Sequence, residues 1–247
     1  KTTRITNAIN IQLLPEGGHL VSEIENTIGI VAKDSLGFGV SIEGHISDSD
    51  NNTITTFKTN VHGIGRFLLT PQKNSSYLAH TLVNNNSQTF PIPLVEPSGI
   101  NLSLADIGSK VAITFRTNSE THLNIKNNNY TLSIHNGKTL KAIAVSFGES
   151  TEITKLIKYD DLSIGINVFT LFDAQNNPLL ERLFFKYDGL NLVESGNAIT
   201  KKSNDSISIK LAIKGVDTTK INKFSVSVLP AETIASKQHH NIISYTY

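Results

Sequence analysis

The stretch from Gly165 to Lys186 limits the possible folds of this chain more than any other. It reads Gly-Ile-Asn-Val-Phe-Thr-Leu-Phe, then Asp-Ala-Gln-Asn-Asn-Pro, then Leu-Leu-Glu-Arg-Leu-Phe-Phe-Lys. Two runs rich in β-branched and aromatic residues thus flank a polar segment. Asp, Asn and Pro favour a turn there, through local side-chain hydrogen bonds and a fixed φ. The pattern predicts a long antiparallel β-hairpin.

Pairing Phe172 with Leu179 would make both faces of this hairpin largely apolar, because side chains alternate across a strand. One face would carry Ile166, Val168, Phe172, Leu183 and Phe185, and the other would carry Phe169, Leu171, Leu180 and Phe184. We therefore expect a sheet or a neighbouring domain to cover each face.

Shorter runs with a period of two recur along the rest of the chain. Between Gly39 and Ile46, the apolar residues alternate with Ser41, Glu43 and His45, as is typical of an antiparallel strand with one solvated face. Such runs follow one another at a spacing of about ten residues, which favours sandwiches or barrels. The predicted fold class is all-β, with tandem antiparallel β-sandwiches of the immunoglobulin-like or fibronectin-like kind.

Prolines mark a predicted boundary between the first two domains. Pro91, Pro93 and Pro97 lie close together, and proline cannot donate a hydrogen bond within a central ladder, so it belongs at edges or between domains. We predict a first sandwich over 1–97, a second over 98–190 and a partial third β module over 191–247.

Three local predictions complete this outline. A short strand is expected at Leu123–Ile125 within the second sandwich. In the third module, Ser206–Lys214 and Phe224–Val228 are expected to be strands, with Ile207, Ile209, Leu211 and Ile213 facing inward. Pro230 is expected to start a short helix over 231–243, since proline suits the first helical turn.

Composition excludes several classes of function. The 247 residues include 22 Lys+Arg against 21 Asp+Glu and no Cys. A net charge of +1 provides no broad field for nucleic acid or an anionic membrane, and no run of about 18 apolar residues predicts a membrane span. Without Cys there is no disulfide, thiolate metal site, thiol nucleophile or thioester. The chain opens without Met, which suits a processed or truncated product.

Few patterns point to catalysis or a cofactor. Asp48–Asn52 resembles the start of a calcium loop, but Thr53 and Thr59 occupy the positions of the required Gly and Glu, so a hairpin tip is favoured. Asp160-Asp161 is interpreted as a solvated turn, because adjacent strand residues point to opposite faces. His239-His240 has no third ligand nearby in the sequence. We expect no catalytic residue, cofactor or metal.

Three stretches carry a family resemblance. Gln12 to Val21 contains Pro-Glu-Gly-Gly-His-Leu-Val. The region from Ala32 to Tyr77 contains Lys-Asp-Ser-Leu-Gly, Phe57-Lys-Thr and His-Gly-Ile-Gly-Arg-Phe, and the hairpin contains Leu-Phe-Asp, Pro-Leu and Glu-Arg-Leu-Phe. In order and spacing they resemble the macroglobulin-like domains of bacterial alpha-2-macroglobulin relatives. They also resemble those of envelope proteins associated with TonB-dependent transport.

The resemblance implies a non-catalytic binding or scaffold region of an exported protein, in the periplasm or at the outer membrane or surface of a Gram-negative bacterium. Its partner would be a protein, and the implied candidate is an outer-membrane transporter complex. The covalent trap of a full macroglobulin cannot reside here, because Cys is absent. Two alternatives stay open: accessory β-domains of a larger hydrolase, and a protease-inhibitor relative that acts without a thioester.

The residues shared with the family have structural interpretations. Glycines after a proline turn allow positive φ, a glycine just before a strand suits a bulge or close backbone approach, and Glu16 is expected to cap backbone N–H groups. Arg182 needs a partner, either Asp173 or a carboxylate at a domain interface. The candidate structural residues are Pro15, Glu16, Gly17, Gly18, Gly63, Gly65, Phe67, Asp173, Glu181 and Arg182.

Three Asp-Ser/Thr-apolar triplets fit the acceptor pattern of some bacterial O-glycosylation systems. Their hydroxyl residues, the candidate modification sites, are Ser35, Ser206 and Thr218.

Overall fold

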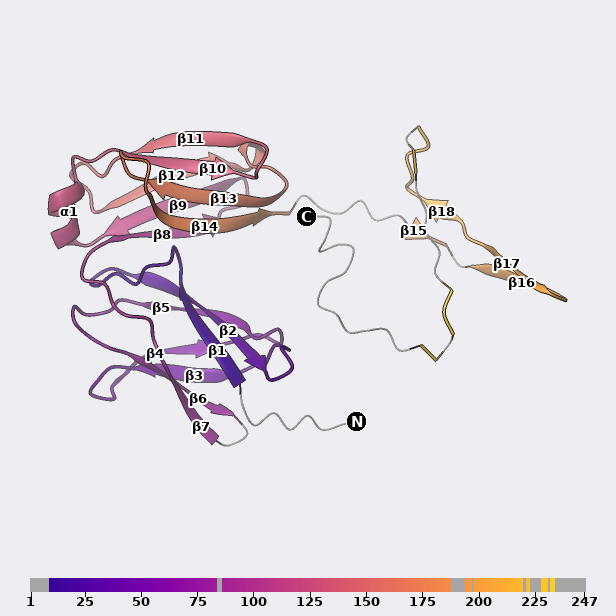
Figure 1. The fold of residues 1–247 in the computed structure, drawn as a ribbon, viewed down its shortest axis with the longest axis horizontal. Coiled ribbons are helices and arrows are strands. Elements are labelled where there is room, and N and C mark those ends of the chain that lie inside the picture. Colours follow the sequence, from indigo (N-terminus) through magenta and orange to yellow (C-terminus); the bar gives the residue numbers. More distant parts are fainter. Residues whose placement is uncertain are drawn as a thin grey trace. The chain divides into compact units, whose positions relative to one another are not determined.

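A computed structural model describes residues 9–83, 86–187, 194–196, 198–219, 221–222, 228–230 and 232–233 (Figure 1). The chain divides into two compact units, residues 1–186 and 187–247. Antiparallel sheets dominate both units, which confirms the all-β prediction.

The first unit begins with a sandwich of seven strands, β1 to β7. One sheet has the order β1-β2-β5, with β1 at Ile9–Pro15, β2 at Asn26–Asp34 and β5 at Ile64–Leu69. The other has the order β4-β3-β6-β7, with β3 at Glu43–Ser47, β4 at Thr53–Lys58, β6 at Leu78–Val83 and β7 at Asn86–Pro91. We call this the first sandwich.

The core of the first sandwich follows the predicted alternation. Ile42 and Ile46 are buried, whereas Ser41, Glu43 and His45 are exposed. Phe67 is also buried, and its ring lies 6.1 Å from that of Phe57 on the facing sheet.

Gly63 and Gly65 allow the backbone to approach closely just before and within β5. Gly63 has a φ of +73°, and a Cβ there would lie 2.0 Å from the carbonyl oxygen of Ala32. A Cβ on Gly65 would lie 2.3 Å from the carbonyl oxygen of Lys58. Any side chain at either position would therefore collide with backbone.

The second sandwich consists of β8 to β14 and has the same strand order as the first, with each strand number raised by seven. One sheet, β12-β9-β8, contains β8 at Ile100–Asp106, β9 at Lys110–Thr117 and β12 at Glu152–Lys158. The other, β11-β10-β13-β14, contains β10 at Tyr130–His135, β11 at Leu140–Val145, β13 at Gly165–Phe172 and β14 at Pro178–Lys186. A 3₁₀ turn, η1, covers Tyr159–Asp161.

The predicted hairpin is β13–β14. Its register runs as expected from Gly165 opposite Lys186 to Leu171 opposite Leu180, but a bulge then pairs Phe172 with Pro178.

One of the two hairpin faces is left open, contrary to expectation. Phe169, Leu171 and Leu180 are buried in the core. On the other face, the exposed fractions are 48% for Ile166, 51% for Leu183 and 46% for Phe185, so the described residues leave much of this face exposed. The expectation that both faces are covered is therefore wrong for the described part of the chain.

The predicted strand at Leu123–Ile125 is also wrong, because this segment belongs to helix α1 (Ser119–Ile125). Asn118 caps the helix by accepting a hydrogen bond from the backbone N–H of Thr121, and Glu120 lies in the first turn. Both features favour a helix start, and the prediction missed this signal because it relied on the apolar residues alone.

The third segment contains β15 (Glu194–Ser195), β16 (Ile199–Ser203), β17 (Ser206–Lys210) and β18 (Ile213–Lys214), which form two two-stranded sheets, β15-β18 and β16-β17. The predicted inward-facing residues Ile207, Ile209, Leu211 and Ile213 are 41% to 65% exposed, so that prediction is wrong. Most of the predicted helix over 231–243 and most of the predicted strand Phe224–Val228 lie outside the described residues, as do His239 and His240.

Candidate functional site

The Pro-Glu-Gly-Gly turn of the first sandwich contacts the second sandwich. The Glu16 side chain is only 9% exposed. Its Oε1 accepts a hydrogen bond from Arg182 Nε at 2.9 Å and another from the backbone N–H of Leu104 at 3.2 Å. Gly17, with a φ of +83°, approaches β8 so closely that a Cβ would lie 3.3 Å from the backbone nitrogen of Leu102. The turn therefore packs directly on the neighbouring sandwich.

Arg182 thus pairs with Glu16 across the junction and not with Asp173. Asp173 instead shapes the β13–β14 turn, where its Oδ1 accepts hydrogen bonds from the backbone N–H groups of Gln175 and Asn177. Glu181, the residue before Arg182, is exposed and accepts a hydrogen bond from a threonine hydroxyl on β13.

Two buried asparagines extend the contact. Asn101, at the start of β8, donates from Nδ2 to Asn26 Oδ1 at 3.1 Å and to the carbonyl oxygen of Glu16 at 3.3 Å. Asn26 in turn bonds to both backbone groups of Val21. Both amides are at most 1% exposed, so these hydrogen bonds are made where water does not compete.

Asn118 joins helix α1, the first sandwich and the linker between the two sandwiches, residues 92–99. Its Nδ2 donates to the carbonyl oxygens of Pro97 at 2.8 Å and Ser22 at 3.2 Å, while its Oδ1 caps the helix. The linker itself is bound to the first sandwich through the backbone, since Ser22 N donates to Glu96 O and Glu96 N to Leu20 O. An ion pair between Lys73 and Glu120 adds a contact at the surface.

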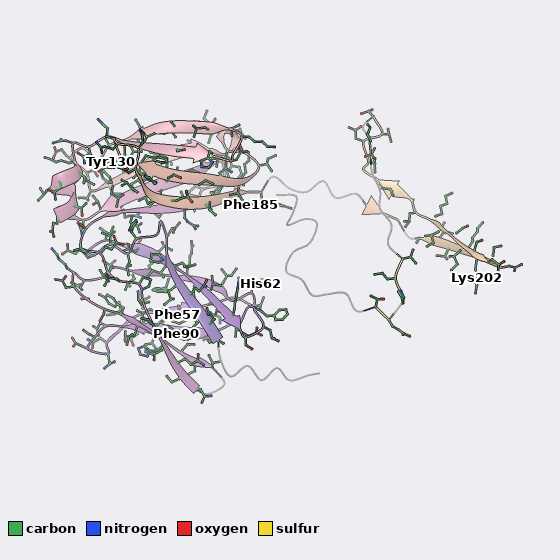
Figure 2. The ribbon with its side chains drawn as sticks, viewed as in Figure 1. Phe57, His62, Phe90, Tyr130, Phe185 and Lys202 are labelled. Atoms are coloured by element: carbon green, nitrogen blue, oxygen red, sulfur yellow. The ribbon has the colours of Figure 1, made fainter. Side chains whose placement is uncertain are left out.

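A cleft of about 650 Å³ opens beside this junction. Its walls are the loop after β1, the linker, the segment between α1 and β10, and the β13–β14 turn, and Tyr130, labelled in Figure 2, belongs to this lining. The polar lining residues are His19, Glu96, Ser98, Thr121, Asn127, Asn128, Asn129, Tyr130, Asp173 and Gln175. This lining contains neither Lys nor Arg.

Most polar groups of the cleft are uncharged. Asn127, Asn129 and Gln175 are exposed, and within the described residues their side-chain amides have no hydrogen bond to protein. A primary amide can both donate and accept. The cleft is therefore suited to a polar ligand or to the backbone of a partner, and the one basic side chain of its lining, His19, is already paired with Glu96.

His19 carries the main ionisable contact of the cleft. Its Nδ1 lies 2.8 Å from Glu96 Oε1, and its Nε2 lies 3.0 Å from the carbonyl oxygen of Leu179. Desolvation by itself would lower the pKa of His19, but the hydrogen bonds to Glu96 and Leu179 and the charge of Glu96 outweigh it. The pKa is therefore raised above the ordinary value.

The other acidic patterns have structural explanations. The carboxylate of Asp48 accepts hydrogen bonds from the backbone N–H groups of Asp50 and Asn52, as Asp173 does in its own turn. Hydrogen bonds from the Asn52 side chain and from backbone lower the pKa of Asp48. Asp161 lies in η1 and pairs with Lys141 at 2.9 Å. Among the described residues, no group of three His, Cys, Asp or Glu side chains is placed to hold a metal ion.

The three candidate glycosylation residues Ser35, Ser206 and Thr218 are exposed. Their modification stays a prediction.

Sequence reasoning found the Pro-Glu-Gly-Gly turn and Arg182 but missed His19, Asn101 and Asn118. The last of these had a local signal, since Asn-Ser-Glu-Thr is a typical helix start. The other two had none, because their partners lie 75 or more residues away along the chain.

Comparisons with known proteins yield only fold likenesses. No family model and no curated protein matches the chain. One similar solved structure is the Salmonella alpha-2-macroglobulin reacted with methylamine, at 10% identity and a TM-score of 0.27, covering 83% of this chain and 16% of that one. Another is the two fibronectin type III domain segment from chicken tenascin, at 14% identity and a TM-score of 0.25, covering 71% of this chain and 97% of that one. The chain thus spans about a sixth of the length of the macroglobulin.

Among the described residues, no helix is long and apolar enough to cross a membrane.

Proposed function

We propose that the chain is a non-catalytic arm of an exported cell-envelope protein, which holds two β-sandwiches in a fixed relation and binds a protein partner beside their junction. The observation that carries this proposal is the polar network in which Glu16, Asn101 and Asn118 bond across the junction. Two sandwiches joined by a flexible linker would not require buried side chains that form hydrogen bonds from one sandwich to the other.

The energetics favour a fixed arrangement. A buried polar group that loses its partner costs about 1–3 kcal/mol, and the junction contains at least three such groups, Glu16, Asn101 and Asn118. Bending the junction would break several of these bonds at once. The two sandwiches should therefore move as one body.

The cleft is the proposed partner site. Loops carried by a rigid scaffold commonly form binding surfaces, and the free amides of Asn127, Asn129 and Gln175 lie on two neighbouring loops of the second sandwich. Such amides can pair with the backbone of a partner segment. The absence of Lys and Arg from the lining favours this over a phosphate-bearing ligand.

The envelope location and an outer-membrane transporter complex as the partner are supported by the sequence resemblance. The test is detergent extraction of the source membranes, affinity purification of the native protein and mass spectrometry. Recovery with an outer-membrane protein complex is the expected result. A cytoplasmic monomer without an envelope partner would refute it.

Two sets of substitutions would locate the contact. Alanine at Asn127, Asn129 and Gln175 should abolish co-purification of the partner. Alanine at the control residues Asn10, Gln12 and Gln72, which are also exposed amides but lie outside the cleft, should leave it intact.

Two further measurements address rigidity and catalysis. Residual dipolar couplings from the full chain at acidic pH should fit one alignment tensor for both sandwiches, and two independent tensors would contradict the proposal. A screen with peptide and glycoside substrates should show no turnover. Activity that survives repurification would favour the hydrolase alternative.

A further inference from the structure

His19 connects three separate parts of the first unit through one imidazole ring. It lies in the loop after β1, and its two ring nitrogens contact Glu96 on the linker and Leu179 on β14. The side chains of His19 and Glu96 are 38% and 39% exposed, so protons from solvent reach the pair.

Both oxygens that face the ring accept hydrogen bonds. The carboxylate of Glu96 lies 2.8 Å from Nδ1 and the carbonyl oxygen of Leu179 lies 3.0 Å from Nε2. A neutral imidazole has one N–H and one lone pair, whereas the imidazolium has two N–H groups. Only the protonated ring can therefore donate to both partners, and the neutral ring leaves one nitrogen lone pair opposite an oxygen.

We propose that His19 is a pH-dependent latch between the two sandwiches. When protonated, it bonds the first sandwich and the linker to β14. When it loses the proton, the neutral ring keeps its hydrogen bond to the charged Glu96 carboxylate, which is the stronger of the two, and loses the one to the Leu179 carbonyl, so this side of the junction loosens. His19 and Leu179 both line the cleft, so the same event widens the cleft. The latch is intramolecular and does not depend on the proposed partner.

The other charged groups around the ring do not reproduce this behaviour. Glu96 is its direct partner, and Asp173 faces the cleft from the β13–β14 turn, where hydrogen bonds from Asn177 lower its pKa. The phenol of Tyr130 also lines the cleft. Among these groups, the histidine is the one whose ordinary pKa lies between about 5 and 8.

The direction of the effect follows from linkage. The pKa of His19 is raised in the folded protein, so its contribution to the junction is complete below the unfolded-state value. That contribution is lost as the pH rises through the folded-state value. The bonds that Glu16, Asn101 and Asn118 make across the junction do not involve His19. Deprotonation thus loosens one side of the junction without separating the sandwiches.

The absence of native cysteine makes the test direct, because two introduced cysteines take spin labels uniquely. Lys33→Cys on β2 and Lys158→Cys on β12 place one label on an exposed position of each sandwich. In the full chain, the distance distribution from electron paramagnetic resonance should shift and broaden between about pH 5 and pH 8. The midpoint should match the titration of the His19 ring measured by NMR.

Three variants decide the outcome. His19→Gln should remove the pH dependence, and Glu96→Gln should move its midpoint to lower pH together with the NMR titration of His19. His62→Gln, an exposed histidine on the first sandwich, should leave it unchanged. The proposal is overturned if the His19 ring titrates without a shift in distances, or if the shift persists in His19→Gln. Since Glu96→Gln retains the imidazole, it tests the proposal even if His19→Gln fails to fold.

Discussion

Replacing Glu16 with alanine should destabilise the first unit more than replacing its partner Arg182. Glu16 is 9% exposed and Arg182 is 42% exposed. Glu16→Ala removes two hydrogen bonds and leaves the N–H of Leu104 without a partner. Since hydrogen bonds to charged groups contribute about 1.5–3 kcal/mol each and less where water competes, we expect a loss of about 2–3 kcal/mol.

In Arg182→Ala, the Glu16 carboxylate keeps its hydrogen bond from the backbone N–H of Leu104, and little water can reach it. Because the guanidinium is half exposed, its charge is partly screened, and we expect a loss of about 1–2 kcal/mol. In the double variant, the coupling energy should be about 1 kcal/mol, which lies between exposed ion pairs and buried charged hydrogen bonds. Glu16→Gln keeps an acceptor for Leu104 and should fall between wild type and Glu16→Ala.

The assay is urea unfolding of the full chain followed by circular dichroism, since there is no Trp for fluorescence. The exposed ion pair of Glu43 and Lys58, within the first sandwich and about 70% exposed on both sides, is the control, and its coupling should be close to zero. Equal effects of Glu16→Ala and Arg182→Ala, with no coupling between them, would refute the role of this pair at the junction.

Three further predictions concern the junction and its turns. Gly17→Ala should lower the melting temperature more than Gly18→Ala does. Both positions have positive φ, but only at Gly17 would an added Cβ lie 3.3 Å from the backbone nitrogen of Leu102 on β8. Equal decreases would argue against that contact. Asn118→Ala should lower stability by about 1–2 kcal/mol through loss of the helix cap, and single-tensor dipolar couplings should fail with it, whereas an unchanged melting temperature would contradict this. Hydrogen bonds from Asn177 lower the pKa of Asp173, so Asn177→Ala should raise that pKa in an NMR titration. The same bonds stabilise the turn at pH values above the unfolded-state pKa of the carboxyl. This stabilisation is lost as the pH falls through the folded-state pKa.

The sequence by itself determined that the chain is built from antiparallel strands, and it determined the register of the longest hairpin as far as Leu171 opposite Leu180. Alternation with a period of two is a local property, and the turn Asp173–Pro178 fixes which residues can face one another. Gly63 was similarly predictable as a position that favours glycine, because positive φ and close approach before a strand favour this residue. Each of these signals is contained within a few consecutive residues.

Tertiary structure alone decided which polar groups meet. Glu16 and Arg182 are 166 residues apart in sequence, and His19 and Leu179 are 160 apart. Neither pairing can be predicted from local periodicity, because each of these residues meets its partner only when the two sandwiches pack against each other. The same holds for the exposed face at Ile166, whose apolar pattern matches that of a buried strand. Whether another layer covers such a face depends on packing between distant segments, which local propensity does not encode.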